Sequence, residues 1–471
     1  MELIRTLKNR TEVQLGVVCL VALLIRLTFY LSVTPWETSS LDYILREGDP
    51  NQYHSQALEY LDRGPIAMFF KEEVFKNNAI DSRVPGYPLF LALFYWLGTP
   101  SPWFALLIQL TIETGNCLLV YLLTVRLFQK PAAGVIASFF YAVSLISAYH
   151  STSELFSDSL FVTIFLSGTL LFIRYISTNN ISDLLMSSIV LALSAYVKPI
   201  GQWVLLIFFI VAICHGLRSR RHFLRVLLFV SAAILVIMPW YLRNMMVHEH
   251  FTFSTSGAVH ITGEVIKSAM WNQGISEQQA VGLIGLKDHD EFQKRGQAVS
   301  WNVKASVSFV LDDPIPYLRY HSKGMFYMLI GTEKGYLLYR LLQLEKPYNV
   351  GHPHSVSFKH RINRVLGDIE EEYFMTPLFL SKLAFEYFAA LLGITILLKK
   401  RQFLIVTLLL LSMALFVIFT GGIGIWLRYK LPIVPIYLSL TGIGTYTMIY
   451  WIRSRKFPDD FLWTRGTKGI V

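Results

Sequence analysis

The chain has 471 residues, of which 54% are hydrophobic and only 16% are charged, and its formal net charge is +10. Soluble domains usually carry about 25% charged residues, so this composition and the recurring apolar runs of bilayer length indicate an integral membrane protein rather than a soluble one. The basic residues gather in short loops between apolar runs, as the positive-inside rule expects, and nucleic-acid binding is therefore a poor explanation of the positive charge.

The apolar runs predict an all-α, polytopic membrane protein with about ten spans, at ~20 apolar residues per span. The first run follows a basic N-terminus and is not followed by a small-residue cleavage site, so we expect it to be retained. The predicted spans are Val13–Val33, Trp103–Phe128, Ala132–Tyr149, Ser159–Ile176, Asp183–Val197, Ile200–His215, Phe223–Tyr241, Pro377–Leu398, Phe403–Thr420 and Leu431–Trp451.

The basic loops predict the orientation of these spans. Loops with Arg126 and Lys130, with Arg174, with Arg218 to Arg225, with Lys399 to Arg401 and with Arg453 to Lys456 all fall on the side of the N-terminus. The chain is expected in the inner or plasma membrane. Both of its termini are expected on the cytoplasmic side.

This orientation divides the chain into three parts. Residues 1–242 form an N-terminal transmembrane module whose first external loop is 34–101, residues 243–376 form a second external region, and residues 377–471 form a C-terminal transmembrane module with a short cytoplasmic tail. Pro88–Gly98 is too short to span and is predicted to lie on or dip into the outer interface, and Pro316–Ile330 carries the aromatic residues of an interfacial helix. We find no internal repeat, which weakens an inverted-repeat transporter.

Two acidic positions at the outer level are candidates for chemistry. Asp49 precedes an amphipathic stretch with Tyr53 and Ala57 in the first external loop, where a carboxylate can accept a proton from a hydroxyl group. Local sequence alone favours a turn or helix-cap role for Asp49. Glu154 and Asp158 share one face if their helix is continuous, and carboxylates so close to hydrocarbon indicate function or pairing, unless Asp158 merely caps the following span.

Four cations lie at the same outer level: Arg83, Lys198, Arg243 and Arg428. Each alone is readily explained by a side chain that reaches out to the interface. As a group they run against the positive-inside bias, and a bound phosphodiester would explain them through charge-assisted hydrogen bonds. Arg26, inside the first span, could reach out to the interface or pair with a carboxylate of the first loop, and we favour the pairing, which would orient the loop that holds Asp49.

We predict no cofactor and no metal. The short runs His248-Glu249-His250 and His352-Pro353-His354 lack a recognised framework of metal ligands. Gly421-Gly422-Ile423-Gly424 does not follow a strand, and the sequence contains no P-loop, so nucleotide-driven pumping is not indicated.

The order of these motifs resembles the GT-C superfamily of membrane glycosyltransferases. The resemblance is to the bacterial branch of the dolichyl-phosphate-mannose protein mannosyltransferase family, which includes the lipid A aminoarabinose transferases. The matching pieces are Arg26, Asp49 with Tyr53 and Ala57, Arg83-Val84-Pro85-Gly86-Tyr87-Pro88, Leu127-Phe128, Ser153 to Asp158, Lys198-Pro199, Pro239-Trp240 with Arg243-Asn244, and Arg428-Tyr429 with Pro432 and Pro435. The chain differs from the family pattern at Pro50, Val84 and Lys198.

The resemblance implies a GT-C-like bundle and an inverting transfer of a sugar from a polyprenyl-phosphate carrier to a lipid, glycan or protein acceptor at the outer face. It implies that Asp49 is the base and that Asp158 corresponds to the family's second acid. The residues expected to bind substrate are Tyr53, Arg83, Tyr87, Glu154, Lys198, Arg243 and Arg428. Membrane lipids are the remaining expected partners, and nucleic acid is not expected.

Two other functions remain open at the level of the sequence. A lipid-carrier flippase or transporter without transferase activity would also need outer cations, but it would more typically show a charged central cavity. A GT-C-like polymerase or ligase acting on lipid-linked oligosaccharide shares all the motifs above.

The cation distribution makes a testable prediction of topology. On a cysteine-free background, Arg220→Cys is expected to resist a membrane-impermeant maleimide added to sealed cells, because positively charged loops stay in the cytoplasm. Asp62→Cys, in the first long loop, is expected to react under the same conditions. Labelling of position 220 from outside would overturn this orientation.

Overall fold

The structure is a computed structural model that describes residues 2–46, 48–64, 83–216, 220–248, 251–287, 295–337, 375–422 and 427–455. The described residues are almost all helical and contain no β-strand, so the expected all-α class is confirmed. The runs around Glu249 and His352 lie wholly or partly outside these residues.

The helices of the N-terminal half carry most of the apolar runs. They are α1 (Glu2–Val33), η1 (Thr38–Ser40), α2 (Leu41–Ile44), α3 (Asp49–Arg63), α5 (Gly86–Leu97), α6 (Pro102–Phe128), α7 (Pro131–Ala142), α8 (Leu145–Thr152), α9 (Asp158–Thr178), α10 (Ile181–Val197), α11 (Gly201–Gly216) and α12 (Arg220–His248).

The remaining helices form an appended group and a C-terminal set. The appended group is α13 (Ser256–Gln273), α14 (Glu277–Ile284), α15 (Arg295–Asp312) and α16 (Pro314–Ile330). The C-terminal set is α19 (Met375–Lys399), α20 (Phe403–Thr420), η5 (Leu427–Lys430) and α21 (Val434–Ser454).

Each predicted span overlaps a helix, and the third overlaps the two helices α7 and α8, but the number of spans stays a prediction. By length and composition, α1 (from Thr11), α6, α9, α12, α19 and α20 can each cross a membrane, which makes 6 among the described residues, or 7 if the bent pair α7 and α8 forms one span. Helices α10 and α11 are apolar but shorter. Helix α21 has 21 residues and is buried along most of its length, so it forms the centre of the bundle rather than a lipid-facing wall.

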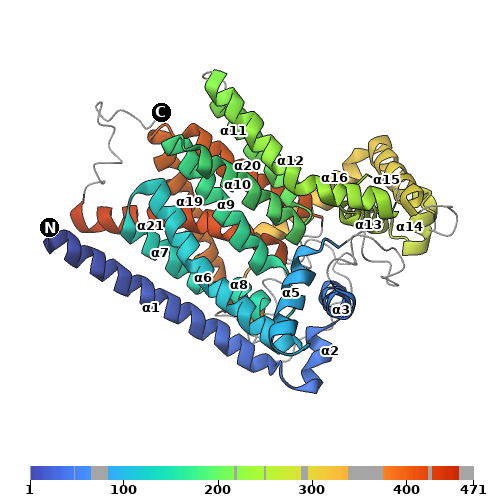
Figure 1. The fold of residues 1–471 in the computed structure, drawn as a ribbon, viewed down its shortest axis with the longest axis horizontal. Coiled ribbons are helices and arrows are strands. Elements are labelled where there is room, and N and C mark those ends of the chain that lie inside the picture. The colour runs from blue at the N-terminus through green and yellow to red at the C-terminus, as the bar shows by residue number, and fades with distance from the viewer. Residues whose placement is uncertain are drawn as a thin grey trace.

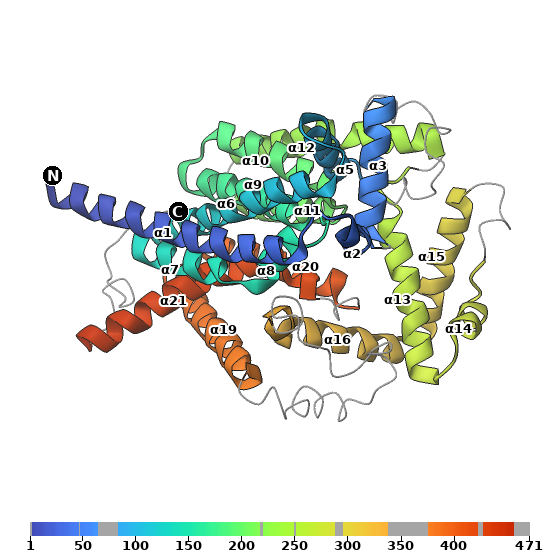
Figure 2. The ribbon, with the colours of Figure 1, turned by 90° about the horizontal axis from the view of Figure 1, so that it is seen from below.

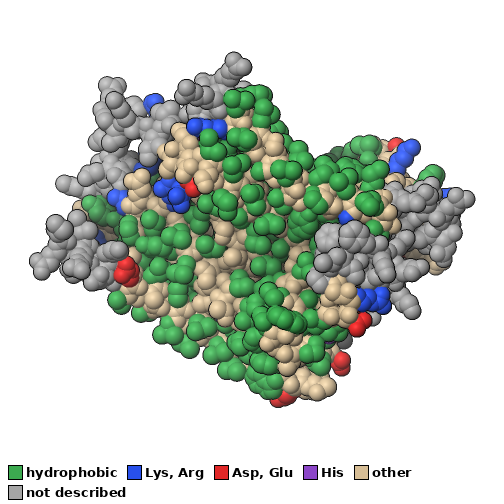
Figure 3. Space-filling model, viewed as in Figure 1, with side chains coloured by type: hydrophobic (Ala, Val, Ile, Leu, Met, Phe, Trp, Pro, Cys, Tyr) green, Lys and Arg blue, Asp and Glu red, His purple; other side chains and the backbone are tan. Residues whose placement is uncertain are grey.

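The two ends of the bundle differ in what they carry. The start of α1 and the end of α21 lie at one end, whereas α3, α5 and α13 to α16 gather at the other (Figures 1 and 2). The described parts of both regions expected to be external therefore lie together. Hydrophobic side chains cover the face of the bundle between these ends, as a surface in contact with lipid requires (Figure 3).

The predicted third span is broken between α7 and α8 by a bend of 55°. A break frees backbone groups that a membrane interior cannot hydrate. Arg26 donates from Nη1 to the Ala142 carbonyl at 3.1 Å, and Glu333 accepts from the Ile146 N–H at 3.1 Å. Two charged side chains, the buried Arg26 and the partly buried Glu333, thus satisfy the broken helix.

The partner expected for Arg26 was wrong. Its guanidinium lies 3.7 Å from Glu113 of α6 and is fully buried, so it pairs within the bundle rather than with the first loop. The reason is the break itself, because the free carbonyl of Ala142 and the hydroxyl of Ser147 draw Arg26 into the bundle.

Helices α19 and α21 cross in close contact because glycine lies at their interface. A Cβ atom added at Gly444 would overlap the carbonyl oxygen of Ala389, and one added at Gly393 would lie 2.5 Å from the carbonyl oxygen of Leu440. Small residues allow membrane helices to approach at the backbone, where dispersion and packing replace the hydrophobic effect.

This crossing predicts a selective loss of stability. Gly444→Ala is expected to lower the free energy of unfolding by about 1–3 kcal/mol, the usual cost of overpacking. Gly16→Ala is the control, because a Cβ added there meets nothing within 4 Å and alanine favours the helix. The check is thermal unfolding of each purified variant in detergent, and equal midpoints for both would contradict the close crossing.

Candidate active site at one end of the bundle

Asp49 is the first residue of α3, and the local sequence explains why it is there. Gly48 has φ 105°, a left-handed conformation that favours glycine, and Pro50 fits the first turn of a helix. The helix then buries Tyr53, Ala57 and Tyr60 along one face, so the expected amphipathic helix after Asp49 is present.

A chain of alternating charges runs through this site. Arg83 Nη2 lies 2.5 Å from Asp49 Oδ1, and Arg428 Nη2 lies 2.9 Å from Asp49 Oδ2. Arg428 also donates from Nε to Asp158 Oδ2 at 2.8 Å, and Asp158 Oδ1 pairs with the Lys198 ammonium group. Two predicted acids and three of the four predicted cations therefore meet in one cluster, which we call the charge chain.

Arg428 is the centre of the charge chain. Its Cζ lies 3.5 Å from the centre of the Phe156 ring, and the side chain is only 7% exposed. A guanidinium that stacks on an aromatic face and bonds a carboxylate at each side is held in one orientation.

The two carboxylates of the charge chain differ in their access to solvent. The side chain of Asp49 is 21% exposed, whereas that of Asp158 is 1% exposed. An acceptor molecule can therefore approach Asp49, while Asp158 is enclosed between Arg428 and Lys198. The difference favours a chemical role for Asp49 and a positioning role for Asp158.

The charges around Asp49 keep it ionised. Burial acts to raise the pKa of this carboxyl, but Arg428 and Arg83 outweigh burial and hold the pKa well below its usual range. Because the folded pKa lies below the unfolded one, the ionised Asp49 stabilises the fold above the unfolded pKa, and this stabilisation is lost as the pH falls through the folded value.

Arg83 packs on the ring of Tyr53, which in turn packs on Tyr87. Arg83 donates from Nε to Gln52 at 2.6 Å, and its Cζ lies 5.6 Å from the Tyr53 ring centre. Tyr53 packs edge-to-face on Tyr87 at 4.9 Å, and the Tyr87 hydroxyl donates to Gln109 at 2.6 Å. Both tyrosines are buried, so the contacts that they make are with protein groups that fix Arg83 and α3.

The motif from Arg83 to Pro88 brings Arg83 and Lys198 together. Lys198 follows directly after α10, and a Cβ added at Gly86 would lie 2.6 Å from the Tyr196 carbonyl oxygen near the end of that helix. Glycine thus allows the start of α5 to pack against the end of α10. Val84 is buried beside Ala195 in the same contact region.

Glu154 lies on a different arm of the site. The condition under which Glu154 and Asp158 would share one face is not met, since α8 ends at Thr152 and α9 begins at Asp158. Glu154 lies 2.6 Å from Arg46 Nη2 and accepts from the Tyr149 hydroxyl at 2.7 Å. It thereby ties the first loop to α8 instead of sharing a face with Asp158.

Arg243 is also placed differently from the other cations. Its Cζ lies 4.9 Å from the centre of the Trp240 ring, and its Nη1 donates to Asn244 at 2.9 Å. Asn244 in turn donates to the Thr252 and Phe253 carbonyls at 2.8 and 3.1 Å. The Trp240 to Asn244 motif therefore shapes the turn that leads from α12 to α13.

Sequence reasoning missed several residues of the site. Gln109 lies in a span and donates to the carbonyls of His150 and Ser151 at 3.3 and 3.1 Å. A polar residue within a span is a signal of function or pairing, so Gln109 could have been found. Gln52 and Phe156 carried no such signal, since their roles depend on the positions of Arg83 and Arg428.

Comparisons with known proteins bear on the family. Residues 82–242 match the family described as dolichyl-phosphate-mannose-protein mannosyltransferase. The fold is similar to that of the Archaeoglobus fulgidus oligosaccharyltransferase in its apo form, at 16% identity and a TM-score of 0.53, over 96% of this chain and 52% of that one. The chain resembles the GT-C glycosyltransferases. The resemblance expected from the order of motifs is thus confirmed.

Other comparisons add detail to this GT-C-like fold. A second structure of the Archaeoglobus fulgidus enzyme, tethered with an acceptor peptide, has a TM-score of 0.50 at 14% identity over 96% of this chain and 52% of that one. ArnT from Cupriavidus metallidurans is a more distant likeness, with a TM-score of 0.37 at 13% identity, over 91% of this chain and 78% of that one. No curated protein sequence matches the chain. The GT-C-like chain spans about half the length of the oligosaccharyltransferase.

The charge chain predicts that its two acids differ in their effect on stability. Asp158→Asn is expected to lower the free energy of unfolding by about 3–5 kcal/mol, because it leaves the buried Arg428 and Lys198 without their shared carboxylate. Asp49→Asn is expected to cost less, since water reaches that side chain. Thermal unfolding of the purified variants in detergent tests this order, which equal losses would contradict.

Proposed function

We propose that the chain is an inverting glycosyltransferase that moves a sugar from a polyprenyl-phosphate carrier to a lipid, glycan or protein acceptor. The observation that carries this proposal is the charge chain, in which an accessible carboxylate, Asp49, lies between cations suited to a phosphate. We place the site at the outer face of the membrane, with both termini in the cytoplasm, because the basic loops are expected on the cytoplasmic side.

The balance of charge favours a donor with a single phosphate. Arg83, Arg428 and Lys198 supply three positive charges, and Asp49 and Asp158 supply two negative ones. The excess of one positive charge is neutralised by one phosphodiester. A lysine ammonium group has three donors and an arginine has five, so both kinds of side chain keep donors for phosphate oxygens while they hold the carboxylates.

The same geometry supports a mechanism without a general acid. Cations next to the phosphate stabilise the negative charge of the leaving polyprenyl phosphate, so its oxygen needs no proton. Asp49 accepts the acceptor hydroxyl proton as the new bond to the anomeric carbon forms. Attack on the face opposite to the departing phosphate inverts the anomeric centre. Asp158 holds Arg428 and Lys198 in place during these steps.

The description of the matched family also supports the proposed donor. The matched family description names a dolichyl-phosphate-linked mannose as donor and a protein as acceptor. The chain is about half the length of the oligosaccharyltransferase, so the acceptor of that enzyme is not carried over. We therefore propose the donor class and leave the acceptor as lipid, glycan or protein.

A transporter or flippase is the alternative, and the buried charges of the bundle are the feature that bears on it. Arg26 is buried in the bundle, but it is engaged with Glu113 and with the broken helix at Ala142 and Ser147. A charged group that satisfies backbone atoms at a helix break has a structural use, so Arg26 needs no transport role to explain it. The transferase is therefore the better explanation.

The proposed base gives the decisive test. Asp49→Asn keeps the size of the side chain and removes its basicity, so the rate of sugar transfer is expected to fall by about 10²–10⁴-fold, the usual contribution of a general base. The measurement is mass spectrometry of envelope glycans and lipid-linked sugars from cells that produce wild-type or variant protein at equal levels. The expected result is loss of the product together with accumulation of the lipid-linked donor.

The matched control is Asp62→Asn on the same helix. The side chain of Asp62 is 82% exposed, so its replacement leaves the charge chain intact and is expected to preserve the product. Unchanged product with Asp49→Asn would eliminate Asp49 as the base.

A further inference from the structure

Two arginines lie beside the turn between α9 and α10, at the end of the bundle opposite the charge chain. Helix α9 begins at Asp158, in the charge chain, and ends at Thr178. The turn that follows therefore lies at the end that also holds the start of α1 and the end of α21 (Figure 2). Arg126 is in the last turn of α6, and Arg174 is near the end of α9. Both side chains are exposed, and we call this pair the arginine fork.

The hydroxyl group of Ser177 lies between the two arginines. Arg126 donates from Nη2 to the Ser177 hydroxyl, and this hydroxyl donates to the backbone carbonyl of Arg174 at 2.9 Å. Side chains three residues apart share one side of a helix, so Arg174 and Ser177 face the same way from α9. Arg126 reaches that side from α6, and the two guanidinium groups therefore lie on one exposed part of the surface.

The contacts of the arginine fork leave an excess of positive charge. In the described part of the chain, Arg126 bonds the neutral Ser177 hydroxyl and forms no ion pair. Arg174 Nε lies 3.2 Å from Asp183 Oδ2, and the Thr178 hydroxyl donates to the same carboxylate oxygen at 3.5 Å. Two cations thus share one carboxylate. Charged groups at the edge of the hydrocarbon region usually have a counter-charge, and here one negative charge is missing.

Both guanidinium groups also keep hydrogen-bond donors for a ligand. A guanidinium has five N–H donors. Arg126 uses Nη2 and Arg174 uses Nε, and their other N–H groups bond no described group. The planar guanidinium matches two oxygens of a phosphate at once, so the arginine fork has the charge and the donors to hold one phosphodiester.

The surface next to Arg126 is apolar. Leu122 and Leu118 precede Arg126 by one and two turns of α6 and share its side of the helix, and they are 48% and 42% exposed. Ile181, the first residue of α10, is 42% exposed. A soluble anion has no use for this apolar surface. A phospholipid fits both parts, because its phosphate lies at the level of the helix ends and its acyl chains lie along the helices.

We propose that the arginine fork binds the phosphate of an anionic phospholipid, with an acyl chain along Leu122 and Leu118. A headgroup with a net negative charge supplies the missing counter-charge, whereas a zwitterionic headgroup would bring its own cation next to the arginines. The bound lipid joins the end of α6 to the end of α9, the helix that begins at Asp158. The site lies at the other end of the bundle from the charge chain, so it is independent of the proposed transfer.

The first experiment compares two lipids that differ only in their headgroups. Phosphatidylglycerol or phosphatidylcholine with the same acyl chains is added in steps to the full chain purified in a neutral detergent, and the midpoint of thermal unfolding is followed. A ligand that binds the folded state raises this midpoint, so phosphatidylglycerol is expected to raise it more than phosphatidylcholine does. Arg126→Gln and Arg174→Gln are each expected to weaken the apparent affinity for phosphatidylglycerol by at least about tenfold, since each loses hydrogen bonds to a charged group.

Two further variants separate a site from a general effect of charge or of folding. Arg453→Gln removes one exposed cation from the end of α21, at the same end of the bundle, and is expected to leave the affinity unchanged. Asp183→Asn removes the carboxylate that competes for Arg174 and is expected to strengthen binding severalfold, which damage to the fold would not do. An equal loss of affinity in Arg126→Gln, Arg174→Gln and Arg453→Gln, or weaker binding in Asp183→Asn, would overturn the proposal.

The second experiment identifies the source of the phosphate and the number of lipids. Glycerol phosphate, which lacks acyl chains, is expected to have no effect at the concentrations at which phosphatidylglycerol acts. Equal stabilisation by both would mean a site for a soluble anion and would refute the lipid. Native mass spectrometry is expected to show one more retained phosphatidylglycerol on the wild type than on the double variant Arg126→Gln/Arg174→Gln. The same number on both proteins would rule out a site at the arginine fork.

Discussion

The buried guanidinium of Arg428 is the interaction on which the arrangement of the site depends. It joins Asp49 of the first loop to Asp158 at the start of α9, and it comes from the C-terminal part of the chain. Moving a charge out of water costs free energy, and only close carboxylates and further hydrogen bonds offset that cost. Three segments that are far apart in sequence must therefore meet in one geometry, or the cation is left buried without compensation.

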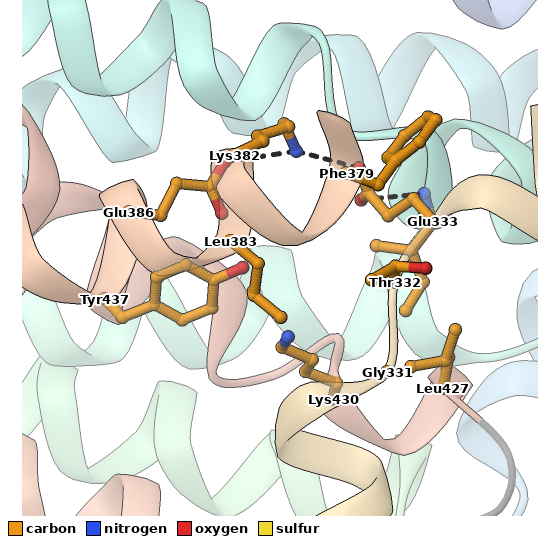
Figure 4. Close-up of a pocket in the computed structure, with 11 residues that line it drawn as sticks. Gly331, Thr332, Glu333, Phe379, Lys382, Leu383, Glu386, Leu427, Lys430 and Tyr437 are labelled. Atoms are coloured by element: carbon orange, nitrogen blue, oxygen red, sulfur yellow. Dashed lines mark hydrogen bonds and ion pairs between the residues drawn. The ribbon is translucent and has the colours of Figure 1, made fainter. Parts of the chain in front are cut away.

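A second constraint comes from the broken helix. Within a membrane every backbone group needs a partner, and the break before α8 is satisfied by Arg26 on one side and by Glu333 on the other. Helix α8 leads directly to Glu154 and Asp158, so its position determines where these acids lie. The same Glu333 lines a small pocket together with Lys382, Glu386 and Lys430 (Figure 4). The need to satisfy the broken backbone thus places Arg26 and Glu333 inside the protein, next to the helix that leads to the candidate site.

The sequence predicted the parts of this arrangement that follow from local rules. The positive-inside bias singled out Arg83, Lys198 and Arg428 as a group, and these cations do meet in the structure. It could not separate them from Arg243, because a cation that stacks on Trp240 and one that faces a carboxylate look alike in one dimension. The partner of Arg26 and the break before α8 depend on contacts between remote helices, which no local pattern encodes.

The charge chain also bears on how a strongly ionised carboxylate can act as a base. Arg428 and Arg83 lower the pKa of Asp49 and so weaken its affinity for a proton. In the proposed function, a donor phosphate shares these same cations and partly neutralises them. The phosphate weakens the attraction between the cations and the Asp49 carboxylate. In this proposal the pKa of Asp49 therefore rises when the donor binds. The hydroxyl of the acceptor, in turn, becomes more acidic as it bonds to the anomeric carbon. Both changes favour proton transfer from the acceptor hydroxyl to Asp49 at the moment of reaction. Without the donor, the two arginines keep Asp49 a weak base.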